Sequence, residues 1–253
     1  MRLGDDYLGC IVYLGWPIAG TDDEIDAVGT GFLVAHDGAH YVVTAAHVAL
    51  RFSRDSLPFG IRLNKVPNTG GVDRIDGAKW YFHPDDKIDV AVLPYVPPSW
   101  AAVKVFPTRH VISDFKRETK NIGPGDQAYV VGIFKLLPGV KRNNPVVHTG
   151  HVASTAEGEE IETLDWRSPA GSPPTLKIQG YIIQVHTMPQ ASGSPVFVRR
   201  SLLGYTRFTP HVDEKKEHSE WCPGSTAAFG SWVSGMARGP TMSENTFILP
   251  RIQ

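Results

Sequence analysis

Three side chains in this sequence have the types and the order that hydroxyl-based acyl-transfer chemistry requires. His47 ends the segment TAAH, Asp89 opens the run DVAVL, and Ser192 opens the segment SGSP. A serine hydroxyl is a weak nucleophile unless an imidazole takes its proton and a carboxylate orients that imidazole. The order histidine, aspartate, serine therefore indicates a candidate catalytic triad.

The elements that must position these residues are predicted to be strands. Short apolar runs alternate with glycine, proline, asparagine and aspartate along the chain, which is typical of an all-β sandwich or barrel. Asp37-Gly38 predicts a hairpin between two of these runs. No stretch has a convincing helical period beyond one or two turns. The strands are expected at 9–14, 30–34, 41–44, 90–93, 127–132, 145–148, 181–185, 195–198, 202–205 and 247–249.

About a dozen strands favour two six-stranded antiparallel barrels, because closing a sheet removes its exposed edges. The polar segment 109–120 is the expected divide, with residues 1–115 in the first barrel and 116–253 in the second barrel of a single domain. The candidate residues then come from both barrels, and the active site lies between them, where clefts tend to form. The polar segments 157–174 and 211–224 are expected to be surface loops.

Composition argues against several other classes of protein. The 253 residues carry a net charge of −1, which gives no electrostatic reason to expect nucleic acid or a membrane surface as a partner. No apolar run reaches the length of a membrane span, and the first residues lack the core of a signal peptide. Cys10 and Cys222 are too few for a disulfide framework, although a single bridge between them is an alternative. We therefore expect a cytoplasmic protein, with a fragment of a larger or secreted precursor as the alternative.

Together, these motifs resemble those of the trypsin-like (chymotrypsin-fold) serine peptidases, in the short, disulfide-poor form common in bacteria. The resemblance covers roughly residues 9–198 and is carried by GTGFLV leading to TAAH, by DVAVL and by SGSPVF. It implies that Ser192 is the nucleophile, that His47 is the general base and then the general acid, and that Asp89 fixes the imidazole. It also implies a protein or peptide substrate, no metal or organic cofactor, and a regulatory partner protein of the kind that many bacterial relatives carry as a fused domain.

By the same resemblance, the backbone N–H groups of Gln190 and Ser192 form the oxyanion hole. The family usually has glycine at the first position, because glycine can turn its peptide without a steric penalty from Cβ. Gln190 makes that turn at greater cost, so we hypothesise an oxyanion hole that is latent until a substrate or partner binds. Ala191 stands where animal trypsins have an aspartate that binds a newly cut amino terminus, so we expect no activation by cleavage there.

The specificity pocket is expected to contain His186, six residues before Ser192, together with Thr206 and Arg207. A histidine or arginine at the base of the pocket favours an acidic substrate side chain through charge-assisted hydrogen bonds.

Two other functions stay open on the sequence alone. A catalytically weak trypsin fold used as a binding or scaffold module is favoured by Gln190 and by the two polar segments. An esterase or other acyl hydrolase would use the same triad. His211, His218 and Cys222 are a loose candidate zinc set, but their spacing is irregular and we expect no metal. The remaining histidines, including His148, are expected to be structural.

Overall fold

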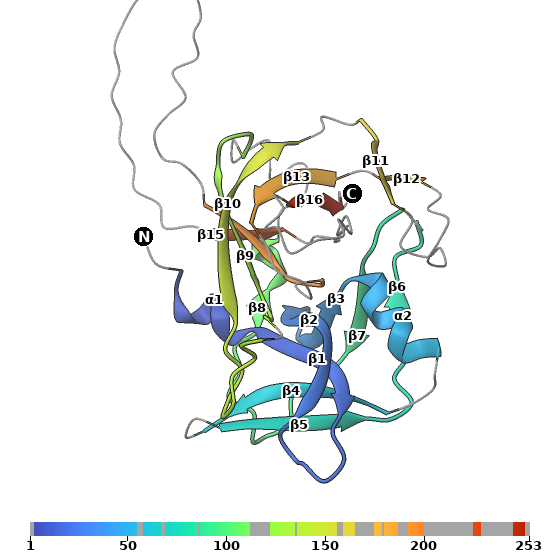
Figure 1. Ribbon diagram of the computed structural model, residues 1–253, viewed down its shortest axis with the longest axis vertical. Coiled ribbons are helices and arrows are strands. Elements are labelled where there is room, and N and C mark those ends of the chain that lie inside the picture. Colours follow the sequence, from blue (N-terminus) through green and yellow to red (C-terminus); the bar gives the residue numbers. More distant parts are fainter. Residues whose placement is uncertain are drawn as a thin grey trace, which may run out of the picture.

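The strands of the computed structural model form two large sheets and one separate hairpin (Figure 1). The residues that it describes are 3–54, 58–66, 69–85, 87–111, 122–134, 136–155, 159–164, 175–178, 180–186, 192–199, 225–228 and 245–250. The first sheet contains β1 (Ile11–Pro17), β2 (Ile25–His36), β3 (Ala39–Thr44), β4 (Phe59–Lys65), β5 (Thr69–Ile75), β6 (Tyr81–Phe82), β7 (Ala91–Pro94) and β8 (Phe106–Pro107). The second contains β9 (Gln127–Gly132), β10 (Val146–Ser154), β13 (Gly180–Val185), β14 (Val196–Arg199), β15 (Ser225–Ala228) and β16 (Asn245–Pro250). The hairpin is β11 (Ile161–Leu164) with β12 (Thr175–Ile178), and the helices are α1 (Asp5–Gly9), α2 (Ala46–Arg54) and the short 3₁₀ helix η1 (Thr108–His110).

The predicted all-β class is confirmed. The first sheet has the strand order β5-β4-β1-β2-β3-β7-β6, with β8 added in parallel to β2, and the second has the order β15-β14-β9-β10-β13-β16. The second sheet has six strands, as predicted, whereas the first has eight because the two-residue strands β6 and β8 join it. Among the described residues, the outer strands of each sheet are not paired with one another, and the predicted boundary at residues 115 and 116 lies outside the described residues.

The long apolar runs of the first three strands reflect burial on both faces. On β1, Val12 belongs to the core inside the first sheet, whereas the next residue, Tyr13, belongs to a cluster that also contains Tyr129, Val131 and Phe197 of the second sheet. Because successive side chains of a strand point to opposite faces, a strand between two cores needs an uninterrupted apolar sequence. The shared cluster packs the two sheets against each other.

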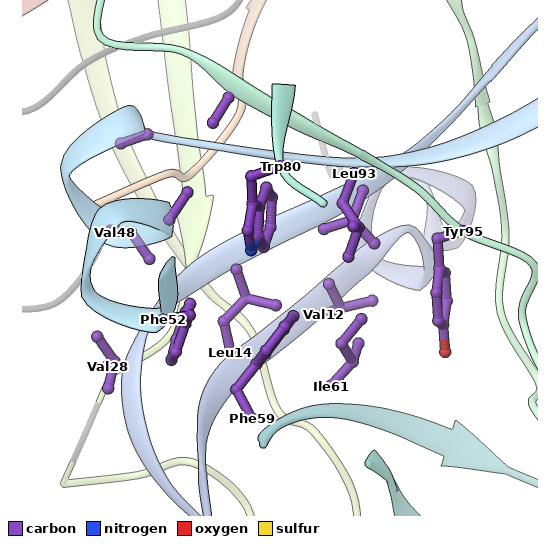
Figure 2. Packing of buried hydrophobic residues seen from close by; sticks show 14 of the residues in the cluster. Val12, Leu14, Val28, Val48, Phe52, Phe59, Ile61, Trp80, Leu93 and Tyr95 are labelled. Atoms are coloured by element: carbon purple, nitrogen blue, oxygen red, sulfur yellow. The ribbon is translucent and has the colours of Figure 1, made fainter. Parts of the chain in front are cut away.

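Aromatic rings pack among aliphatic side chains in the core inside the first sheet (Figure 2). Phe52 of α2 stacks on Phe59 of β4 with ring centroids 4.6 Å apart, and Phe59 lies 5.8 Å from Trp80. Since Phe52 belongs to α2, this packing fixes the helix that carries His47.

One local prediction from the sequence, the hairpin, is confirmed, and another, a surface loop, is wrong in part. The hairpin between β2 and β3 is confirmed, with φ of 46° at Asp37 and 79° at Gly38. The prediction of a loop over 157–174 is wrong at Ile161–Leu164, which is strand β11 because it pairs with β12. The rest of that segment from residue 165, and all of 211–224, lie outside the described residues.

Two further observations concern membrane-spanning helices and the thiols. No helix in the described part of the chain is long and apolar enough to cross a membrane. The Cys10 thiol is free and buried, and burial raises its pKa to about 12. Cys222 lies outside the described residues.

Candidate active site

Asp89 holds His47 through two hydrogen bonds. The backbone N–H of His47 donates to Oδ1 of Asp89 at 2.9 Å, and Nδ1 of the ring lies 2.7 Å from Oδ2. Asp89 is 1% exposed, whereas the His47 side chain is 23% exposed. One buried carboxylate therefore fixes both the backbone and the ring of a histidine that solvent can reach.

The pairing of β3 with β7 brings these two residues together. Thr44, the last residue of β3, lies opposite Ala91, the first residue of β7. His47 follows Thr44 as the second residue of α2, and Asp89 precedes Ala91. Asp89 also places a negative charge at the start of α2, where the unpaired N–H groups of a helix favour it.

The turn at Ser192 is attached to β2 of the first sheet. The carbonyl oxygen of Ser192 accepts a hydrogen bond from the N–H of Thr30 at 2.9 Å. A Cβ on the adjacent Gly29 would lie 3.2 Å from that oxygen and 2.9 Å from the methyl carbons of Val48. Because Val48 follows His47 in α2, the backbone of Ser192 and the helix of His47 meet at Gly29.

Gly193 allows the same turn to approach the start of α2. Its φ is 83°, and a Cβ there would lie 2.1 Å from the carbonyl oxygen of Thr30 and 2.3 Å from Oγ1 of Thr44. Ala45 lies just beyond, with its backbone nitrogen 3.2 Å from that Cβ position. Only glycine fits both the backbone conformation and the space.

Thr30 connects the parts of the site that come from the two sheets. Besides its bond to Ser192, its carbonyl accepts the Thr44 hydroxyl at 2.7 Å, and its own hydroxyl oxygen accepts the N–H of Ile133 at 2.9 Å. The residue is fully buried. Thr30 is therefore hydrogen-bonded to β3 of the first sheet, to the residue that follows β9 and to the Ser192 turn.

The family model of the trypsin-like peptidase domain matches residues 29–203, which is more than half of the 253 residues. The chain belongs to this family. The predicted resemblance is therefore confirmed, and the match spans the segments that contain His47, Asp89 and Ser192.

One solved structure with a TM-score above 0.5 shows the same fold. The trypsin-like domain is similar to the protease domain of MamO from Magnetospirillum magneticum in its apo form, with a TM-score of 0.53, 15% identity, and coverage of 96% of this chain and 92% of that one. Further similar structures are the Rv3671c protease from M. tuberculosis in its active form, with 14% identity, a TM-score of 0.45 and coverage of 96% and 76%, and Deg5, with 20% identity, a TM-score of 0.45 and coverage of 74% and 73%. No curated protein matches the chain. At 15% identity, the likeness to MamO shows the fold alone.

The other predicted site residues of this trypsin-like domain are placed only in part. His186 is exposed and directly follows β13. Gln190, Thr206 and Arg207 lie outside the described residues, as does Ala191, so the oxyanion hole and the rest of the pocket stay predictions. The candidate zinc residues also lie outside them, and no group of three metal-ligating side chains occurs in the described part of the chain.

Sequence reasoning treated His148 as structural, but the structure places it against a predicted site residue. Burial lowers the pKa of the His148 ring below its usual value, and the backbone of His186 acts in the opposite direction by favouring the protonated ring. The sequence signal for this placement is the alternation of buried and exposed residues along β10, where Gly150 and Val152 are buried and His151 is exposed. This alternation can be interpreted only when it is known which face of the strand is buried.

Proposed function

We propose that this trypsin-like domain is a serine endopeptidase that cleaves protein or peptide substrates through an acyl-enzyme. The double hydrogen bond between His47 and Asp89 carries the proposal. With Nδ1–H directed at the carboxylate, the lone pair of a neutral ring lies on Nε2. That is the tautomer required of a base that takes a proton from a serine hydroxyl.

In the first half of the reaction, Oγ of Ser192 attacks the carbonyl carbon of the scissile peptide bond, and its proton moves to Nε2 of His47. The resulting imidazolium is stabilised by the ionised carboxylate of Asp89. Nε2 then gives the proton to the leaving amine as the C–N bond breaks, which leaves an ester between Ser192 and the acyl part. In the second half, water attacks this ester with His47 again as the base, and the proton passes from Nε2 to Oγ of Ser192 as the ester bond breaks and the acid product leaves.

The negative oxygen of each tetrahedral intermediate needs backbone N–H donors, and loss of one donor typically costs about 3 kcal/mol of transition-state stabilisation. In this proposal, the donors are Ser192 and Gln190. The hole is latent until a substrate or a regulatory partner protein binds, because a residue with a Cβ makes the required turn less readily than glycine does.

Labelling by a fluorophosphonate tests the proposal, because this probe reacts only with a serine that is activated by its base. We expect labelling of the wild type that is lost in Ser192→Ala. Ser194→Ala is the matched control, since it removes a hydroxyl two residues away in the same segment, where Ser194 is buried and its Oγ has no partner among the described residues. The control should keep the label.

Mapping of cleavage sites in a proteome then identifies the bond that is cut, by comparison of the wild type with Ser192→Ala. Peptide-bond cleavage that depends on Ser192 supports an endopeptidase, whereas hydrolysis of esters alone supports the esterase alternative. If neither label nor cleavage depends on Ser192, with and without added peptides, the chain is a binding or scaffold module instead.

A further inference from the structure

The connection between β9 and β10 exposes apolar side chains to solvent. Leu136 is 83% exposed, Leu137 is 53% exposed and Val140 is 90% exposed. In the described part of the chain, only two other large apolar side chains are more than half exposed, Val66 at 78% and Val96 at 84%. Single apolar residues on a surface are ordinary, but several in one short segment indicate an interaction site.

Hydrogen bonds from the first sheet hold this connection in place. The two terminal nitrogens of Arg62 donate to the carbonyl oxygens of Gly139 at 2.9 Å and Val140 at 3.2 Å. The backbone N–H of Asn143 donates to Oδ1 of Asn64 at 2.7 Å, and Nδ2 of Asn143 donates to the carbonyl of Arg62 at 2.7 Å. Because Arg62 and Asn143 are both buried, the exposed side chains project from an anchored backbone.

The turn between β4 and β5 lies beside this connection. Val66 follows Lys65, the last residue of β4. A Cβ on Gly70 of β5 would lie 3.3 Å from the carbonyl oxygen of Lys141. We call residues 65–66 and 136–142 the end loops. In Figure 1, the connection from β9 reaches the left ends of β4 and β5, whereas α2, which carries His47, lies on the right.

The end loops carry positive charge next to the apolar side chains. They contain Lys65, Lys141 and Arg142 but no aspartate or glutamate. Lys141 and Arg142 are exposed and directly follow Val140. Lys65 is half-buried, with Nζ 4.7 Å from the centre of the Trp100 ring. The net charge of −1 for the whole chain therefore conceals a local excess of cations.

The acidic residues closest to this region are met by Arg62. Its Nε donates to the carbonyl oxygen of Asp23 at 2.8 Å, on the side opposite the nitrogens that hold Gly139 and Val140. The carboxylates of Asp23 and Glu24 act on the Arg62 guanidinium, where they oppose the lowering of its pKa by burial. Arg62 thus places a buried cation between these carboxylates and the end loops.

We propose that the end loops bind the surface of a membrane that contains anionic phospholipids. Leu136, Leu137 and Val140 enter the boundary between headgroups and acyl chains. Lys141 and Arg142 stay at the level of the headgroups, where their long side chains reach the lipid phosphates. A protein partner fits less well, because lysine is depleted from the cores of protein–protein interfaces.

This inference differs from the expectation of no membrane partner, which was drawn from the net charge. Attraction to a charged membrane falls off within a Debye length, so it depends on the cations nearest the surface and not on the total charge. The inference does not rest on the proposed peptidase function, because the end loops contain none of the proposed catalytic residues.

Binding of the full chain to lipid vesicles tests the inference. We expect vesicles of phosphatidylcholine with about 30% phosphatidylserine to bind the chain at least about tenfold more strongly than phosphatidylcholine alone, and salt to weaken this binding. Lys141→Gln combined with Arg142→Gln should weaken it by about 25-fold, or about fivefold for each cation. Arg51→Gln combined with Lys79→Gln is the matched control, because it removes two exposed cations elsewhere and should leave binding unchanged.

The apolar contribution is tested by Val140→Ser, which should weaken binding to the anionic vesicles by at least about tenfold. Val96→Ser is its matched control, since Val96 is 84% exposed but has no lysine or arginine within seven residues in the sequence. In the unaltered chain, a spin-labelled lipid in the same vesicles should broaden the amide resonances of Leu136 and Val140 and leave that of Val96 sharp.

Three results would each overturn the inference: equal binding to neutral and anionic vesicles, no vesicle binding by the folded chain, or the same loss in Val96→Ser as in Val140→Ser. A chain that is dimeric without lipid, and monomeric only as Val140→Ser, would also overturn it, because a second copy would then cover the end loops. Vesicle binding by a chain whose Ser192 never reacts would overturn the proposed peptidase function and leave the inference standing.

Discussion

At Asp89, one buried carboxylate accepts two N–H groups of the same histidine. Oδ1 takes the backbone N–H of His47 at 2.9 Å, and Oδ2 faces Nδ1 at 2.7 Å. The first bond supports the start of α2, and the second sets the tautomer of the ring. A substitution that keeps the bond to the backbone N–H of His47 but places a donor opposite Nδ1 can separate the support of α2 from the control of the tautomer.

Asp89→Asn is that substitution. The amide oxygen can still accept the backbone N–H of His47, so we expect the thermal unfolding temperature to change little. The amide N–H₂ then faces Nδ1 and favours the opposite tautomer, with the proton on Nε2, so kcat should fall by about 10⁴-fold, the loss known for this change in a serine-protease triad. The measurement is kcat for peptide cleavage.

Asp76→Asn is the control, because it removes an exposed carboxylate from the bend that follows β5 and should leave kcat unchanged. A loss of less than about tenfold in Asp89→Asn would contradict the assigned role of Asp89.

The two histidines of interest show what single residues reveal before a structure exists. His47 was predictable, since the chemistry of a serine nucleophile requires a base and a carboxylate, and both occur in recognisable segments. His148 was not, because its significance depends on which face of β10 is buried and on the register that puts it beside His186. Neither fact follows from the types of residue in the strand.

At the scale of the elements, the turn that begins at Ser192 packs closely against β2 and β3. Gly193 has a φ of 83°, and a Cβ on it would overlap the carbonyl oxygen of Thr30 and the hydroxyl of Thr44. These contacts place the turn against Thr44 at the end of β3, and Thr44 lies three residues before His47 in the sequence. The positioning of Ser192, the proposed nucleophile, therefore depends on the absence of a side chain at Gly193.

Gly193→Ala should move the turn away from His47 and reduce kcat/KM by at least about 100-fold, since small displacements of a reacting group have costs of this size. Gly38→Ala is a closely matched control, because Gly38 has a φ of 79° but no atom within 4 Å of its Cβ position. Gly38→Ala should lose about 1 kcal/mol of stability from the left-handed backbone conformation, and Gly193→Ala should lose more than this because its Cβ also overlaps Thr30 and Thr44. The measurements are kcat/KM and the free energy of unfolding in urea, and equal activity of the two variants would contradict this account.

The elements themselves were predictable where one residue pattern decides the structure. Asp37-Gly38 determined the hairpin, and the doubly buried strands appear as apolar runs. Helix α2 has only nine residues, which is too short for a clear helical period, and its place depends on Phe52 packing on Phe59. Strand β11 was missed because its partner β12 is eleven residues away, across a segment rich in glycine, serine and proline.

For the molecule as a whole, the joint between the two sheets depends on buried polar groups as well as on the shared apolar cluster. Arg62 of β4 is 4% exposed and donates hydrogen bonds to three carbonyl oxygens, those of Asp23 at 2.8 Å, Gly139 at 2.9 Å and Val140 at 3.2 Å. The last two carbonyls belong to the connection between β9 and β10 of the second sheet. One guanidinium thus links the first sheet to the connection that leads into the strand of His148, and nothing in the sequence around Arg62 indicates this role.

Arg62→Ala should lower the free energy of unfolding by about 2 kcal/mol or more, because it leaves the partly buried carbonyls of Asp23 and Gly139 without their charged donor. Arg62→Lys should recover only part of this loss, since an ammonium lacks the planar fork that reaches several carbonyls at once. Arg74→Ala is the matched control, since Arg74 is exposed and donates to the single carbonyl of Thr21, and its effect should stay within about 0.5 kcal/mol. Urea denaturation followed by tryptophan fluorescence measures all three variants. If Arg62→Ala unfolds no more readily than Arg74→Ala, the connection between β9 and β10 is held by other contacts, and the apolar cluster alone joins the sheets.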